Sequence, residues 1–121
     1  MTTVRTLVVD DTLFIRQMLK QILSHTEFEV VGEAANGEQA VSKYDELAPD
    51  LVIMDIIMPG VSGLDAVKQI MEKHPEARIV MCSALGHEHV VVEALSAGAR
   101  DFIVKPFVPA QVLQTLRTLI D

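Results

Sequence analysis

The chain has 121 residues and a formal net charge of −7, with ten basic residues scattered among seventeen acidic ones. A chain of this length is expected to form one domain, over residues 1–121. The acidic balance repels a phosphate backbone, so we expect no direct contact with nucleic acid. Half of the residues are hydrophobic, but no apolar run approaches the roughly 20 residues of a membrane span. We therefore expect no contact with a membrane.

The N-terminal sequence and the cysteine content predict a cytoplasmic protein. The first residues, Met-Thr-Thr-Val-Arg, lead directly into a strand-like run and lack the apolar core and cleavage site of a signal peptide. The one cysteine, Cys82, lies in an apolar run. This position predicts a buried, reduced thiol, and a single cysteine excludes a disulfide within the chain.

The chain opens with a strand pattern that ends in acid. Residues 7–9 are apolar and are followed directly by Asp10 and Asp11. A short continuous apolar run is typical of a strand buried on both faces. Thr12 is expected to cap a helix, because apolar side chains recur at helical spacing over residues 14–22. The first unit is therefore a strand followed by a helix.

The next unit repeats this order. Residues 29–34 alternate weakly between polar and apolar, as an outer strand does. Asn36 is expected to cap a helix that extends to Leu47. The following run, residues 51–54, is fully apolar and again ends in a carboxylate, Asp55. Two buried strands are thus expected to end in acid.

The rest of the chain continues to alternate helices with strands. The expected elements are a helix capped by Ser62 and ended by Pro75, a strand over residues 78–83, a helix over residues 87–97 stopped by Gly98, a strand over residues 102–104, and a helix opened by Pro109.

Five strand and helix alternations predict an α/β domain with a doubly wound parallel sheet and helices on both faces. In such sheets ligands bind at the carboxyl ends of the strands. The informative residues are therefore those that end strands. These are Asp10, Asp11, Asp55, Ser83 and Lys105.

Residues of these types in one crevice would suit phosphoryl transfer. Carboxylates about 4 Å apart repel by roughly 1 kcal/mol in water and about 4 kcal/mol at an effective dielectric of 20. Mg²⁺ removes that cost and prefers oxygen ligands, whereas Zn²⁺ would favour His or Cys, which these strand ends lack. One carboxylate can then attack phosphorus to form an acyl phosphate. Lys105 and Ser83 supply an ammonium and a hydroxyl for the phosphoryl oxygens.

The same residues resemble those of the receiver domains of two-component response regulators, over essentially the whole chain. The resemblance rests on the sequences Val-Val-Asp-Asp-Thr at residues 8–12, Asp-Ile-Ile-Met-Pro-Gly at residues 55–60, Ser83-Ala84, and Lys105-Pro106-Phe107. It implies a flavodoxin-like (CheY-like) fold with five strands in the order 2-1-3-4-5.

The resemblance also assigns roles to individual residues. It makes Asp55 the phosphoacceptor, and it makes Asp10, Asp11, Asp55 and the Ile57 backbone carbonyl the ligands of Mg²⁺. Ser83 and Lys105 would contact the phosphoryl group. The implied protein is a switch that assists its own phosphorylation and dephosphorylation, and is not an enzyme.

Activation in this family draws the hydroxyl of strand four toward the phosphoryl group while an aromatic residue of strand five turns inward. Ser83 and Phe102 occupy these positions, and Phe102 departs from the best-known relatives in lacking a tyrosine hydroxyl. The family often has a cis peptide bond at the position of Lys105-Pro106. Ile57 and Leu85 occupy positions that tune the lifetime of the acyl phosphate, and we expect these apolar side chains to slow its hydrolysis.

Within the family, residues 81–84 and 98–102 look most like stand-alone chemotaxis receivers of the CheY type. That resemblance implies a monomer that receives its phosphoryl group from a CheA-type histidine kinase. The implied target is the flagellar motor switch protein, bound through helix four, strand five and helix five.

Three other functions fit parts of the pattern. A receiver cut from a longer transcription factor or enzyme would have the same site, and a longer natural reading frame would reveal it. A phosphatase with an aspartyl nucleophile separates its two aspartates by one residue, so the adjacent Asp10 and Asp11 argue against it. A flavin carrier of this fold would need a phosphate-binding loop rich in Ser and Thr after strand one, which the sequence lacks.

Overall fold

The structure is a computed structural model that describes residues 3–84 and 87–120. Leu85, one of the two residues expected to tune phosphoryl lifetime, lies outside these ranges. Helices and strands alternate along the chain as the sequence predicts. They are β1 (Val4–Val9), α1 (Leu13–Leu23), β2 (Phe28–Ala34), α2 (Gly37–Leu47), β3 (Leu51–Asp55), α3 (Gly63–Lys73), β4 (Ile79–Ala84), α4 (Glu88–Ala97), β5 (Asp101–Lys105) and α5 (Pro109–Ile120).

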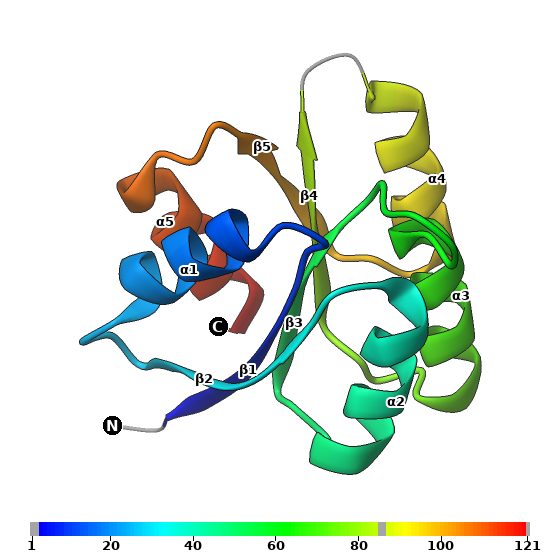
Figure 1. The fold of residues 1–121 in the computed structure, drawn as a ribbon, viewed down its shortest axis with the longest axis horizontal. Helices are drawn as coiled ribbons and strands as arrows, with labels where there is room; N and C mark the ends of the chain where they lie inside the picture. The colour runs from blue at the N-terminus through cyan, green and yellow to red at the C-terminus, as the bar shows by residue number, and fades with distance from the viewer. Residues whose placement is uncertain (1–2, 85–86, 121) are drawn as a thin grey trace.

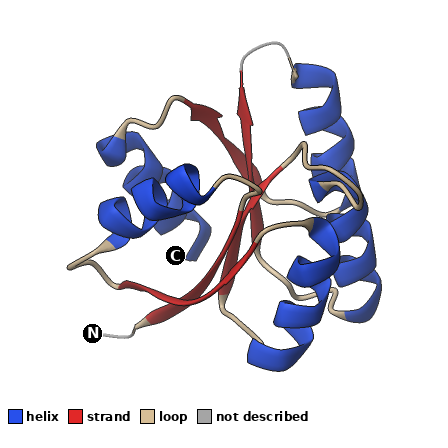
Figure 2. Ribbon diagram, viewed as in Figure 1, coloured by secondary structure: helices blue, strands red, loops and turns tan. Residues whose placement is uncertain are grey.

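The strands form one parallel sheet in the order β2-β1-β3-β4-β5, which confirms the predicted fold. Helices α1 and α5 cover one face of the sheet, and α2, α3 and α4 cover the other (Figure 1). The strands therefore form the middle of three layers (Figure 2). The pairing of β1 with β3, predicted only through the family resemblance, brings the ends of these two strands together.

The core lies on both faces of the central strands. The side chains of Leu51 to Met54 in β3 are completely buried, with alternate residues belonging to the apolar clusters on opposite faces of the sheet. This double burial explains why the sequence of β3 is a continuous apolar run without polar alternation. Cys82 is buried in β4 as predicted, and burial raises the pKa of its thiol.

Three helix caps were predicted by the same reasoning, and one of them is wrong. The Ser62 side chain caps α3 as predicted. The Asn36 side chain accepts a hydrogen bond from the Gln39 backbone N–H at 2.8 Å, as a capping residue should. Thr12 occupies the cap position of α1, but its side chain makes no capping hydrogen bond. Instead, its backbone N–H donates to the Asp10 carboxylate at 2.9 Å. An acid two residues earlier therefore binds the start of this helix.

An ion pair joins the last helix to the chain ahead of β2. The Arg117 guanidinium donates to both carboxylate oxygens of Glu27, each at 2.9 Å. This contact lowers the pKa of Glu27 to about 2. Among the helices of the described ranges, none combines the length and hydrophobicity that a membrane span requires.

We expect the cap positions Asn36 and Thr12 to differ in their contributions to stability. Asn36→Ala should lower the free energy of unfolding by about 1 kcal/mol, because a backbone N–H of α2 loses its partner. Thr12→Ala is the matched control and should change it by less than about 0.5 kcal/mol. Urea denaturation measures both variants. An equal loss in both would contradict the assignment of the caps.

The Glu27–Arg117 pair should make stability depend on pH. Because the folded pKa of Glu27 lies below its unfolded value, the stabilisation is fully present above about pH 5 and is lost as the pH falls through 4.5 towards about 2. Arg117→Gln should therefore be less stable than wild type at pH 7, and the difference should shrink over that acidic range. Urea denaturation between pH 7 and pH 3 tests this, and a constant difference would contradict it.

Candidate phosphorylation and metal site

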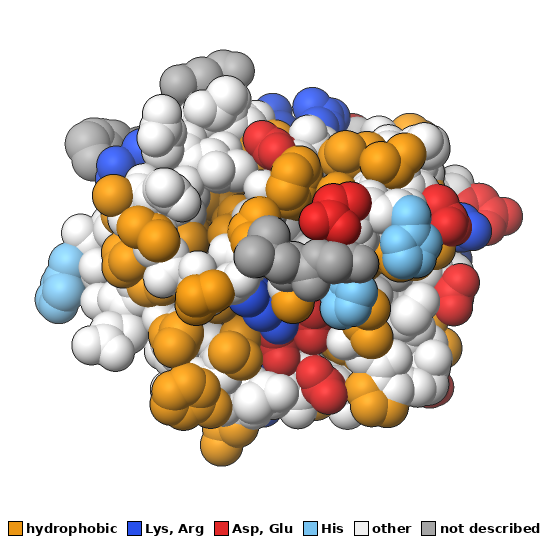
Figure 3. Space-filling view, turned by 90° about the horizontal axis from the view of Figure 1, so that it is seen from above, with side chains coloured by type: hydrophobic (Ala, Val, Ile, Leu, Met, Phe, Trp, Pro, Cys, Tyr) orange, Lys and Arg blue, Asp and Glu red, His pale blue; other side chains and the backbone are white. Residues whose placement is uncertain are grey.

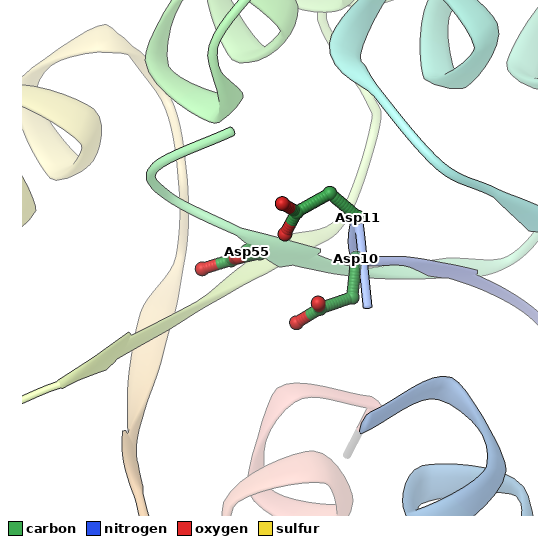
Figure 4. A group of neighbouring side chains, drawn as sticks. All are labelled: Asp10, Asp11 and Asp55. Atoms are coloured by element: carbon green, nitrogen blue, oxygen red, sulfur yellow. The ribbon is translucent and has the colours of Figure 1, made fainter. Parts of the chain in front are cut away.

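Three carboxylates meet at the carboxyl edge of the sheet. Asp55 is the last residue of β3, and Asp10 and Asp11 directly follow β1, whose Val9 pairs with Met54. Each aspartate offers one oxygen, and these oxygens lie within 4.8 Å of one another (Figure 4). Asp10 and Asp55 are only 1% and 8% exposed, whereas Asp11 faces solvent. The predicted convergence of the three acids is therefore present.

Lys105 at the end of β5 joins the two buried acids. Its Nζ lies 3.0 Å from Asp10 Oδ2 and 3.4 Å from Asp55 Oδ1. Burial opposes the charge of this ammonium, but the hydrogen bond to Asp10 and the charge of Asp55 together raise the Lys105 pKa above its usual value. Burial raises the pKa of Asp55, although Lys105 acts in the opposite direction. One ammonium thus only partly compensates two buried carboxylates.

These residues fit a hard divalent cation. All three side chains offer oxygen ligands, and the charge of Lys105 leaves the group net negative. Mg²⁺ usually binds one or two carboxylates and keeps waters or phosphate oxygens in its other positions. The exposed side of the cluster, at Asp11, leaves room for such ligands. The acidic group is the kind that holds Mg²⁺ in receiver domains.

Ser83 lies at the same edge of the sheet but makes no described contact with Asp55. It is 3% exposed near the end of β4, between β3 and β5. Its hydroxyl donates to the Ala84 backbone carbonyl at 3.0 Å. Ala84 pairs with Lys105 across the two strands, so Ser83 lies one residue earlier along β4, opposite Val104. The Lys105-Pro106 peptide bond is cis, as the resemblance implied.

A hollow beside Phe102 was not foreseen from the sequence. Phe102 is 40% exposed and, with Val104, faces α4 across a cavity of about 300 Å³. Ser83 also lines this cavity, as do Val91 and Leu95 of α4. Val91 and Val92, two of the consecutive valines of α4, line the cavity although valine is a poor helix former. A cavity depends on packing between distant elements, so no local pattern could have revealed it.

Glycine is required at position 63 by its close packing against the end of β3. It is the first residue of α3, and a Cβ built on it would lie 2.1 Å from the Asp55 backbone oxygen. The glycine is therefore needed for close approach to the end of β3. Gly60, by contrast, has a φ of +74°, as a turn glycine does.

In the view down onto the carboxyl edge, acidic and basic side chains lie together in a recess between apolar patches (Figure 3).

The sequence matches a known family: the family model of the response regulator receiver domain matches residues 6–117. The chain is a member of that family. The predicted resemblance is thereby confirmed.

Several relatives are chemotaxis proteins named CheY. The protein from Thermotoga maritima is 54% identical over 112 residues, which cover 93% of each chain. The protein from Bacillus subtilis is 51% identical over 117 residues, covering 97% of this chain and 98% of the relative. A solved CheX–CheY–BeF3–Mg complex from Borrelia burgdorferi matches with a TM-score of 0.93 at 39% identity, covering 99% of this chain and 91% of the other. This receiver is of the CheY type.

The excess negative charge of Asp10 and Asp55 over Lys105 should lower the free energy of unfolding when no metal is present. In EDTA at pH 7, Asp55→Asn should be more stable than wild type by about 1 kcal/mol, because one buried carboxylate is removed from beside another. The Asp55 pKa is raised on folding, so wild type loses stability as the pH rises through that pKa, and the gain should shrink in acid. Thermal denaturation at several pH values measures it.

Glu72→Gln, which removes an exposed carboxylate on α3, is the matched control and should be neutral. Added Mg²⁺ should raise the melting temperature of wild type more than that of Asp55→Asn. If Asp55→Asn were less stable than wild type in EDTA, the Lys105 contact would outweigh the burial of the carboxylate.

Proposed function

We propose that residues 1–121 form a single receiver domain that works as a phosphorylation-activated switch in chemotaxis. Asp55 is the phosphoacceptor, and Asp10, Asp11, Asp55 and the Ile57 backbone carbonyl are the ligands of Mg²⁺. The observation that carries this proposal is the convergence of three carboxylates at one edge of the sheet, where Lys105 contacts two of them, Asp10 and Asp55. The protein acts as a binding switch rather than as an enzyme.

In the transfer step, a carboxylate oxygen of Asp55 attacks the phosphorus of a phosphohistidine. An O–P bond forms as the N–P bond breaks, and the electron pair of that bond stays on the imidazole, which takes up a proton. Mg²⁺ held by the three aspartates would supply positive charge to offset the negative charge of the phosphoryl oxygens. Lys105, already 3.4 Å from Asp55, can exchange that contact for one with a phosphoryl oxygen. Burial of Asp55 keeps bulk water away from its carbonyl carbon.

The switch is proposed to pass through Ser83 and Phe102. A phosphoryl group on Asp55 offers an acceptor to the Ser83 hydroxyl, which would leave the Ala84 carbonyl. That movement alters the wall of the cavity beside Phe102, and the half-exposed ring has about 300 Å³ of space to turn into. The exposed face of α4, β5 and α5 would change as a result. Coupling of about 1 to 3 kcal/mol changes partner affinity roughly 5- to 150-fold.

The partners are proposed from the relatives. Because the similar proteins are named chemotaxis protein CheY, we propose a CheA-type histidine kinase as donor and the flagellar motor switch protein as target. The output face carries apolar side chains that are at least one-third exposed, among them Val92, Leu95 and Phe102. Lacking a phenol hydroxyl, Phe102 can bind a partner only through its ring. A cytoplasmic monomer suits these partners.

Intact-mass analysis after incubation with acetyl phosphate and Mg²⁺ tests the proposal. Wild type should gain one phosphoryl group of about 80 Da, and Asp55→Asn and an EDTA-treated sample should gain none. Asp45→Asn, which removes an exposed aspartate of α2, should react as wild type does. An adduct on Asp55→Asn would place the phosphoacceptor elsewhere. No adduct on wild type, with no binding of beryllofluoride, would mean a receiver that signals without phosphate.

Ile57 should control how long the phosphoryl group lasts. It lies two residues after Asp55 and is 48% exposed, so its apolar side chain can limit the approach of water to the acyl phosphate. Ile57→Asn should speed loss of the phosphoryl group several-fold, and Ile57→Leu, the matched control, should leave the decay near that of wild type. Phosphoprotein decay after removal of the donor measures it. Equal or slower decay in Ile57→Asn would contradict the shielding role.

A further inference from the structure

The loop between β3 and α3, residues 56–62, carries the Ile57 carbonyl and is closed at its base by backbone contacts. The Gly63 N–H donates to the Ile56 carbonyl at 3.1 Å, and Gly63 packs against the Asp55 backbone. The start of α3 therefore fixes where the loop leaves and rejoins the fold. These contacts do not determine the position of its tip.

The second half of this loop is hydrogen-bonded to a different helix. The backbone N–H of Gly37, the first residue of α2, donates to the Val61 carbonyl at 3.0 Å. A Cβ built on Gly37 would lie 2.3 Å from the Val61 oxygen and 2.7 Å from Val61 Cγ1. Both distances are too short for real atoms, so α2 and the loop can approach this closely only with glycine at position 37.

The start of α2 is well placed to act as a fixed support. Asn36 caps the helix, and the Gln39 side chain accepts in turn from the Ala35 backbone N–H at 2.9 Å. Just ahead of this cap, the Ala34 carbonyl accepts from the Asp10 N–H at 3.1 Å. Hydrogen bonds therefore connect the junction of β2 and α2 to Asp10 and to Val61, which belongs to the loop that carries the Ile57 carbonyl.

We propose that Gly37 is a positioning residue for Mg²⁺ binding and phosphoryl transfer, an inference that rests on the proposed function. An added methyl group at position 37 would push Val61 away. Because the cap holds α2 and Gly63 holds the base of the loop, the displacement falls on residues 57–61. The Ile57 carbonyl then moves relative to Asp10, which weakens metal binding without removing any ligand.

Isothermal titration of Mg²⁺ into Gly37→Ala compares its affinity with that of wild type. Changes in the groups that orient metal ligands typically cost about 10- to 100-fold in affinity, so we expect a loss of roughly tenfold or more. Phosphorylation by acetyl phosphate should be slow at low Mg²⁺ and return close to the wild-type rate at saturating Mg²⁺.

Gly32→Ala is the matched control. Its Cβ would meet the end of the flexible Leu47 side chain, and in the described structure Gly32 makes no backbone hydrogen bond to the loop. Circular dichroism should show both variants folded, and Gly32→Ala should bind Mg²⁺ as wild type does. If both variants lost affinity equally, general destabilisation would explain the loss and the inference would be overturned.

The wild-type protein gives an independent test that needs no variant to fold. In a Mg²⁺ titration followed by amide NMR, the Gly37 signal should shift with the same midpoint as the titration, and the Gly32 signal should not. A Gly37 signal that stays still, or wild-type affinity in Gly37→Ala, would overturn the inference alone. Failure of wild type to bind Mg²⁺ would instead overturn the proposed function on which it rests.

Discussion

The structure depends on two like charges buried side by side. Pairing of β1 with β3 places Asp10 and Asp55 next to each other beneath the surface. At an effective dielectric of 20, carboxylates about 4 Å apart repel by roughly 4 kcal/mol. Lys105 relieves part of this repulsion from the other side of β4. The remaining negative charge favours a divalent cation, which would leave Asp55 free to act as the proposed nucleophile toward phosphorus.

The sheet also connects this charge to the distant face of the molecule. β4 separates the strand of Asp55 from the strand of Phe102, and Ser83 lies at the end of β4 that borders both. In the proposed switch, a change at Asp55 would therefore reach the cavity under α4 through the Ser83 side chain and strand β4. Around the site the packing is close, as at Gly63 and Gly37, whereas the output side contains empty space. A rigid site beside a hollow suits a switch with two arrangements.

Sequence reasoning succeeded where the signal is local. Continuous apolar runs marked the strands buried on both faces, and the acids that follow them marked the edge where ligands bind. It failed at Thr12, whose side chain makes no capping hydrogen bond and whose backbone N–H donates to the Asp10 carboxylate. It also did not show why glycine is needed at positions 63 and 37, because both glycines pack against atoms from other parts of the chain.

By itself the sequence determined the alternation of elements and the residue types at the strand ends, because burial and capping act over a few neighbouring residues. The motifs at Asp55 and Lys105 also identified the family before any geometry was known. The tertiary structure decided which strands are neighbours, how near Lys105 lies to Asp10 and Asp55, and which helix is hydrogen-bonded to the loop after Asp55. These distances arise from packing between residues far apart in the chain, where no short pattern records them.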